Sequence, residues 1–295
     1  MFLTRTLLPA LVLTTLLPGS SADVGEAKRE SEWGANAFVE WQSGDAPLVI
    51  SVPHGGGLQP DELKNRSYGK TVRDGRTAEI GAELSKAIFK ATGKVPYIIY
   101  CHLHRSKLDA NREIVEAAQQ DAQAELAWKE YHSFIERARA KVIEEYGAGL
   151  YVDLHGQSHP ENWIEWGYTI SGEALSDPSS TETSSIDHLL RNSELSLSEL
   201  LRGPTSLGAR AQELGYASVP SPAHPDPDGG HYFSGGYSTR RHGSKSGGTI
   251  DGVQLELPRR LRMDTKNRER LCRDLATVLV GFLEDHYDLD WVESE

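Results

Sequence analysis

Two histidines occupy the positions in this sequence where chemistry is easiest to recognise. His54 follows an apolar run in "VPHGGG", and His155 ends another apolar run in "VDLHGQ". A glycine comes directly after each histidine, which lets the backbone turn sharply and leaves space beside the imidazole. Catalytic zinc takes three protein ligands, often histidines and a carboxylate, and keeps a fourth position for water. The two histidines therefore predict a zinc site, although a glycine-rich turn with an incidental histidine is the alternative for His54.

Three acidic residues compete for the third ligand position of this site. Asp74, in "VRDGRTAEIG", precedes an expected helix, where an aspartate commonly serves as the N-cap. Glu79 and Glu62 are the rival candidates. Asp153 stands two residues before His155, so on a strand both side chains point the same way. Asp153 is expected either to orient an imidazole from behind or to serve as a turn residue.

Glu256 and a basic segment provide further reactive groups. Glu256 stands between leucines in "VQLELPRR". Burying a lone glutamate on a strand costs free energy unless the side chain is paired or has a function. Glu256 would suit the role of a general base that acts on a zinc-bound water. The segment "HRSKLDANR" contains Arg105 and Arg112, whose guanidinium groups can bind a carboxylate through two parallel hydrogen bonds, and Asn111, which adds a donor and an acceptor. The alternative for this segment is a helix N-terminus with salt bridges.

The elements that must position these residues follow from the apolar pattern. Buried strands are predicted at 47–52, 95–103, 149–155 and 250–257, with 163–170 extending the sheet. Helices are predicted at 77–93, 113–147, 206–214 and 265–287, several with a glycine stop. Strands that alternate with helices indicate an α/β fold with a mostly parallel sheet. Ligands bind beyond the carboxyl ends of such strands, which is where the candidate residues stand.

The chain has no internal repeat and no linker, so residues 46–290 are interpreted as one catalytic domain. Residues 171–194 are predicted to form an exposed polar loop. Residues 225–248 form a long glycine-rich loop of the kind that often lines an active site.

The N-terminus has the pattern of an export signal. Residues 1–22 contain Arg5, the apolar run "LLPALVLTTLL" and a small-residue cleavage site, which predicts a cleaved signal peptide. A plain N-terminal helix or a retained anchor is the alternative. Residues 23–45 are expected to be a loose polar leader. No later stretch is long and apolar enough to span a bilayer, so we expect a periplasmic or secreted protein without a stable membrane span.

Charge and cysteine usage narrow the class of protein further. The formal net charge of −12 argues against a nucleic-acid or anionic-membrane partner, because phosphates would be repelled. Export would permit a disulfide between Cys101 and Cys272, and two buried free thiols are equally compatible with the sequence. Neither cysteine lies in a CxxC pair, which argues against a thiolate zinc site. The sequence does not predict an oligomeric state.

Six segments follow one another along the chain: "VPHGGG", "RDGRT", "HRSKLDANR", "DLHGQS", "FSGGYSTRRHG" and "VQLELPRRLRMD". In this order they resemble the N-formylglutamate amidohydrolase family, over about residues 47–264. That family is related to zinc carboxypeptidases, aspartoacylase-like deacylases and zinc N-acetylmuramoyl-amidases. The sequence departs from the family pattern at Gly55 and Gly156, where serine is usual.

The resemblance implies a three-layer α/β/α sandwich of the phosphorylase/hydrolase-like kind, with a mostly parallel or mixed central sheet. It implies one zinc ion bound by His54, Asp74 and His155. The expected function is hydrolysis of an amide bond in an N-acyl amino acid or a similar small carboxylate-bearing substrate. An exported zinc carboxypeptidase or peptidoglycan amidase is the first alternative, and a non-catalytic carboxylate-binding protein on the same fold is the second.

The resemblance also assigns roles to the remaining motif residues. Glu256 would be the base, and Arg105 would polarise the scissile carbonyl. Asn111 and Arg112 would hold the free carboxylate of the substrate. Asp109 and Tyr237 are further substrate-binding residues implied by the family pattern, and the pair Arg240-Arg241 is the next candidate for an anchor.

Overall fold

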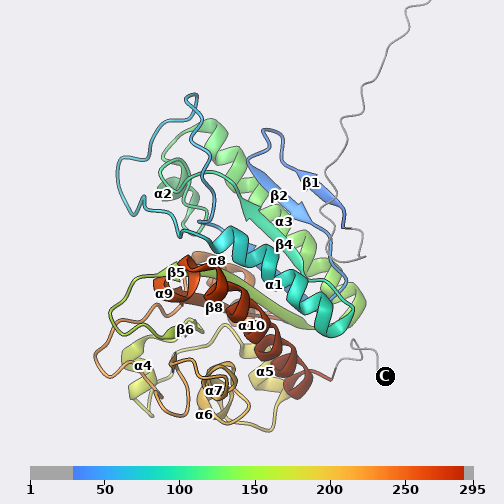
Figure 1. Cartoon of the computed structure of the whole chain (residues 1–295), viewed down its shortest axis with the longest axis vertical. Helices are drawn as coiled ribbons and strands as arrows, with labels where there is room; N and C mark the ends of the chain where they lie inside the picture. Colours follow the sequence, from blue (N-terminus) through green and yellow to red (C-terminus); the bar gives the residue numbers. More distant parts are fainter. Residues whose placement is uncertain (1–28, 289–295) are drawn as a thin grey trace, which may run out of the picture.

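The computed structural model describes residues 29–288, which form one eight-stranded mixed sheet with helices on both faces (Figure 1). The strands have the order β1-β2-β4-β3-β5-β8-β6-β7 in the sheet. They are β1 (Ser31–Trp33), β2 (Val39–Gln42), β3 (Leu48–Val52), β4 (Tyr97–Cys101), β5 (Gly149–Gln157), β6 (Ile164–Gly167), β7 (Ser218–Val219) and β8 (Ile250–Pro258). The central strands β4, β3, β5 and β8 are parallel, whereas β2 and β6 run antiparallel to their central neighbours.

The helices cover the sheet because its central strands are apolar on both faces over most of their length. The longer helices are α1 (Thr77–Thr92), α3 (Ala122–Tyr146) and α10 (Thr265–His286). The shorter ones are α2 (Ile114–Ala118), α4 (Gly172–Ser176), α5 (Asp187–Asn192), α6 (Leu197–Arg202), α7 (Leu207–Glu213), α8 (Tyr237–His242), the 3₁₀ turn η1 (Ser244–Ser246) and α9 (Arg259–Met263). Helices α1 and α10 pack side by side on one face, and α3 covers the other (Figure 1). The predicted three-layer α/β/α architecture is confirmed.

Each face of the sheet has its own apolar core. Leu48, Ile50 and Val52 of β3 contribute to the core under α1 and α10, whereas Val49 contributes to the core under α3. This division is the two-residue side-chain alternation of a strand. The two cysteines lie in different cores: Cys272, on α10, belongs to the core under α1 and α10, whereas Cys101, on β4, belongs to the core under α3. Both are free and buried. Of the two possibilities left by the sequence, the structure has two buried thiols.

The long helix expected at 113–147 is divided into α2 and α3. Gln119 and Gln120 adopt positive φ angles of 48° and 66°, which end α2. Asp121 then starts α3, because its carboxylate accepts hydrogen bonds from the backbone amides of Gln123 and Ala124. The apolar period continues across this break, so the pattern alone predicted a single helix.

Three regions expected to be irregular contain regular structure. The second half of the predicted glycine-rich loop at 225–248 forms α8 and η1. Residues 31–33 and 39–42, assigned to the loose leader, form β1 and β2 at the edge of the sheet. Residues 171–194 contain α4 and α5, and the Ser171 side chain caps α4. These elements are too short to give a readable period. The predicted signal peptide at 1–22 lies outside the described residues, and within 29–288 no helix is both long and apolar enough to cross a bilayer.

Candidate metal centre and cleft

The α3 face of the sheet becomes polar near the carboxyl ends of its strands. Val152 and Leu154 of β5 face the α1 core, so the alternating residues Asp153 and His155 face the opposite side. Glu256 on β8 pairs in register with His155. Glu165 on β6 pairs with Glu256 from the other side. One row across three strands therefore carries an imidazole and two carboxyl groups.

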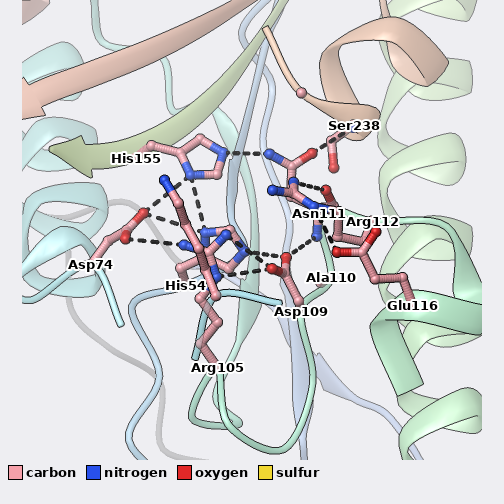
Figure 2. A network of polar contacts seen from close by, with 12 residues as sticks. His54, Asp74, Arg105, Asp109, Ala110, Asn111, Arg112, Glu116, His155 and Ser238 are labelled. Carbon is pink, nitrogen blue, oxygen red and sulfur yellow. Dashed lines mark hydrogen bonds and ion pairs between the residues drawn. The ribbon is translucent and has the colours of Figure 1, made fainter. Parts of the chain in front are cut away.

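Three side chains from separate elements converge beside this row (Figure 2). The Nδ1 atoms of His54 and His155 lie 3.2 Å apart. Asp74 Oδ2 lies 3.3 Å from the Nδ1 of His54 and 3.1 Å from that of His155. A tetrahedral zinc ion with ligand bonds of about 2.0–2.1 Å separates its donors by roughly 3.3 Å. The three donor atoms therefore have the mutual spacing that a zinc ion requires.

A carboxylate lies behind each imidazole. Asp109 Oδ1 is 2.6 Å from His54 Nε2, and Asp153 Oδ2 is 2.9 Å from His155 Nε2. The Ser51 hydroxyl donates to the other Asp153 oxygen at 2.7 Å. Carboxylates in these positions hold the proton on Nε2 and leave the Nδ1 lone pairs available to a metal ion. Of the two roles considered for Asp153, the structure shows the orienting one.

The charges of the cluster stabilise one another against burial. Burial acts to raise the pKa of Asp74, but hydrogen bonds and charge from His155 and His54 outweigh it and hold that pKa well below its usual range. Burial acts to lower the pKa of His155, but the Asp153 carboxylate outweighs this effect and raises that pKa well above its usual value. A divalent cation would interact favourably with the same carboxylates.

The structure places Asp74, rather than either rival, with the two histidines. Its side chain does not cap α1, whose N-cap position is Arg76 and lacks a side-chain cap. Glu79 lies on α1 and pairs with Arg76 at 2.7 Å. Glu62 is exposed in a turn at residues 61–63, in the long connection between β3 and α1.

Glu256 is buried beside the three candidate metal ligands, and one of its two carboxyl oxygens has no hydrogen-bond partner among residues 29–288. Gln254 Nε2 donates to Glu256 Oε1 at 3.0 Å, while Oε2 has no hydrogen-bond partner within residues 29–288. Burial raises the pKa of Glu256 to about 8. An unpaired oxygen on a buried carboxyl group, facing a cleft, is a suitable proton acceptor.

This raised pKa predicts a pH dependence of stability. A carboxyl group whose pKa is higher in the folded than in the unfolded protein holds its proton more tightly when folded, so stability falls as pH rises between the two values. Between about pH 4.5 and 8, the wild type without added metal should therefore lose stability relative to Glu256→Gln. Urea unfolding of both proteins across this range checks the prediction. A stability difference that does not change with pH would contradict it.

An open cleft of about 1120 Å³ lies above the cluster. The metal-ligand candidates line it together with Glu256, Arg105, Asn111 and Arg112. The predicted glycine-rich loop contributes the stretch 232–236, and Arg240 follows on α8.

Arg105 and Asn111 are held in place before any substrate arrives. Arg105 Nε donates to Asp109 Oδ2 at 2.9 Å, and its Nη1 lies 3.6 Å from Asp74 Oδ1. Asn111 Oδ1 accepts from the Ser238 amide at 2.8 Å. Only part of the Arg105 guanidinium group is thus left for a substrate.

Arg112 is more open to the cleft. Its side chain is one-third exposed, its Nη1 donates to the Asn111 carbonyl at 2.7 Å, and its Nε lies 3.3 Å from Glu116. In Figure 2, Asp74 and Asn111–Arg112 lie on opposite sides of the two imidazoles.

Two residues expected to touch substrate lie elsewhere. Asp109 is fully buried behind His54 and pairs with Arg105, so it positions these two groups. Tyr237 packs its ring against Trp128 and does not line the cleft. It lines a neighbouring hollow of about 490 Å³ that also contains Arg112. The family pattern identified the motif residues but gave no direction for these two side chains.

Ser51, Gln254 and Glu165 are polar groups of the site that sequence reasoning did not select. All three are buried on the polar face of the sheet. Gln254 is two residues before Glu256, so strand alternation places both side chains on the same face. The same rule placed Asp153 beside His155, and it could have identified Gln254 as a residue of the site.

The two glycines that depart from the family pattern are explained by close packing. A Cβ atom at Gly55 would lie 2.7 Å from the Ala78 backbone nitrogen, at the start of α1. A Cβ at Gly156 would lie 2.3 Å from the Arg262 guanidinium carbon. A larger residue at position 55 would press on the start of α1, and one at position 156 would require the buried Arg262 side chain to move.

Gly55→Ser should therefore lower the free energy of unfolding by about 1–3 kcal/mol, because the clash is with backbone. Gly57→Ser is the matched control, since a Cβ there meets only the end of the exposed Arg73 side chain. Urea unfolding of both variants measures the difference. Equal stability of the two variants would show that the close contact between position 55 and the start of α1 does not exclude a side chain.

Two solved structures share this fold. An N-formylglutamate amidohydrolase from Ralstonia eutropha JMP134 superposes with a TM-score of 0.50 at 14% identity, covering 81% of this chain and 93% of its own. The gene product Atu2144 from Agrobacterium tumefaciens superposes with a TM-score of 0.55 at 12% identity, covering 86% of this chain and 99% of its own. No protein-family model and no curated protein matches the sequence. The resemblance found in the six motifs is thus supported at the level of the fold.

Proposed function

We propose that this protein is a zinc-dependent hydrolase of an amide bond in an N-acyl amino acid or a similar carboxylate-bearing substrate. One observation carries the proposal. Three donor atoms converge at the mutual distances that a zinc ion requires, beside the unpaired carboxyl oxygen of Glu256. The solved structure from Ralstonia eutropha that shares the fold is named as an N-formylglutamate amidohydrolase, which agrees with this activity.

The residues of the cluster fit one zinc ion. His54, Asp74 and His155 would hold it, and the carboxylates of Asp109 and Asp153 would orient the two imidazoles. When bound, zinc supplies Lewis acidity, and it lowers the pKa of a coordinated water.

The residues of the chain then perform the proton transfers and hold the substrate. Glu256 accepts a proton from the attacking water and later gives it to the leaving amine. The cleft-facing part of Arg105 donates to the carbonyl oxygen as negative charge develops there. Asn111 and Arg112 hold the free carboxylate on the other side of the imidazoles.

The size of the cleft favours a second candidate within the same chemistry. A volume of about 1120 Å³ exceeds what one small N-acyl amino acid fills. A carboxypeptidase or peptidoglycan amidase would use the same ligands and base on a larger substrate, and export, which we also propose, suits such a substrate. The Glu256 carboxyl group distinguishes either enzyme from a non-catalytic carboxylate binder.

The test is hydrolysis by the zinc-loaded protein of N-formyl and N-acetyl amino acids, peptides and muropeptides, followed by the appearance of free amine. Activity that requires zinc and disappears in Glu256→Gln supports the proposal. Tight binding of these compounds without turnover would instead assign the non-catalytic role.

Arg112→Ala should weaken substrate binding without a comparable loss of turnover. If the contact with the carboxylate is equally strong in the ground and transition states, its loss appears in KM. A substrate with a neutral amide in place of the carboxylate should be hydrolysed about equally by wild type and variant. Steady-state kinetics on the two substrates measures this. Discrimination that persists in Arg112→Ala would place the anchor at another arginine, with Arg240 and Arg241 next.

A further inference from the structure

The segment 109–112, which contains Asn111 and Arg112, lies in a turn between β4 and α2. No sheet or helix ladder fixes its peptide groups. Within residues 29–288, the carbonyls of Ala110 and Arg112 accept no backbone hydrogen bond. A carbonyl that is buried without a partner costs free energy, so these two groups need donors from elsewhere in the fold.

Helix α3 supplies one donor to each carbonyl. The indole Nε1 of Trp128 donates to the Arg112 carbonyl at 2.8 Å, and His132 Nε2 donates to the Ala110 carbonyl at 3.1 Å. Trp128 and His132 are both buried. They are four residues apart and so share one face of the helix, where their rings meet edge to face with centroids 4.4 Å apart. One surface of α3 thus holds the peptide groups that enclose Asn111 and Arg112.

His132 also connects this segment to α8. Because a carbonyl only accepts, the bond to Ala110 requires the proton of His132 to be on Nε2. Burial lowers the pKa of His132 well below its usual value, so the ring is neutral, and its Nδ1 accepts from His242 Nε2 at 2.8 Å. The other nitrogen of His242 lies 3.2 Å from Glu136 and makes no hydrogen bond.

Helix α8 packs on the same surface of α3. The Tyr237 ring centroid lies 5.4 Å from that of His132 and 5.9 Å from that of Trp128. The next residue, Ser238, donates its amide to Asn111 Oδ1 (Figure 2). The backbone around Asn111 is therefore held by α3, and its side chain is held by α8.

We propose that Trp128 and His132 are positioning residues that set the preference of the cleft for a substrate with a free carboxylate. Neither of them lines the cleft, so they act through the peptide groups from which Asn111 and Arg112 project. The inference rests on the proposed function, which assigns the carboxylate to Asn111 and Arg112. Loss of either bond frees a peptide group to rotate, and only the carboxylate of a ligand should then lose its contacts.

The test measures the preference for a carboxylate directly. N-acetylalanine and its neutral counterpart N-acetylalaninamide are titrated into the zinc-loaded Glu256→Gln protein, with binding followed by ligand-observed NMR. We expect the acid to bind about 10–100-fold more tightly, as charged hydrogen bonds contribute. In that background Trp128→Phe keeps an aromatic ring but removes the indole donor, and it should reduce the preference about 3–10-fold. The affinity for the amide and the zinc content should not change.

Further variants separate positioning from general stability. His132→Leu should also reduce the preference, whereas His132→Gln should keep most of it, because the glutamine amide can donate to the Ala110 carbonyl. Trp166→Phe is the matched control. It removes a buried indole hydrogen bond, from Nε1 to Ser218 Oγ at 2.7 Å, in the opposite core, and it should leave the preference unchanged.

A preference that survives both Trp128→Phe and His132→Leu would overturn the positioning role. Equal losses of affinity for the acid and the amide would overturn it as well, because they indicate a general structural change. Equal binding of acid and amide to the Glu256→Gln parent would refute the carboxylate site of the proposed function, and the positioning role with it. Because binding is measured directly, a wild type that hydrolyses neither compound does not alter this readout.

Discussion

Replacing Glu256 by glutamine is expected to lower kcat by on the order of 10²–10⁴-fold, the usual contribution of a positioned base. Glutamine preserves the shape of the side chain, and its oxygen can still accept the hydrogen bond from Gln254. It cannot take a proton from the attacking water. Because the loss affects proton transfer and not the metal ligands, zinc should remain bound at the wild-type level.

Steady-state kinetics and zinc analysis of the same preparation measure this result. Gln254→Ala is the matched control, because it removes the hydrogen bond to Glu256 Oε1 but keeps the carboxyl group. It should be affected much less than Glu256→Gln. Near-normal turnover in Glu256→Gln with zinc still bound would remove the base assignment.

His155→Ala is expected to abolish stoichiometric zinc binding, because it removes one of three converging donors and leaves Asp74 and Asp153 without the imidazole between them. Asp109→Asn should have a smaller effect. It keeps all three donors but weakens the orientation of His54, and such changes typically cost 10–100-fold in metal affinity.

Competition with a chromophoric chelator measures both affinities without reference to activity. The expected order is wild type, then Asp109→Asn, then His155→Ala. Zinc affinity in His155→Ala equal to that of the wild type would show that the ion binds elsewhere.

The parts of the fold that the sequence predicted are those with long, regular patterns. The strands β3, β4, β5 and β8 are buried on both faces, so apolar residues predominate in each and only a few polar residues interrupt them, which makes them easy to recognise. The edge strand β1 and its neighbour β2 carry polar residues and are only three and four residues long. The division between α2 and α3 depends on two glutamines with positive φ, residues that rarely mark such a turn.

The same distinction holds for the candidate site. The three metal-ligand candidates and Glu256 were predicted because strand ends and motif order selected them, and the structure brings them together. The direction of a side chain in a loop depends on tertiary contacts. Asp109 was therefore expected at the substrate but lies behind His54. Glu165 was overlooked because its partner His159 becomes its neighbour only through the turn between β5 and β6.

Zinc content of the purified wild-type protein, determined together with amide hydrolysis in the presence and absence of a chelator, tests the central claim most directly. We expect one zinc ion per chain, loss of hydrolysis when the chelator removes it, and recovery when zinc is restored. Hydrolysis that continues in protein shown to contain no bound metal would contradict the proposed mechanism.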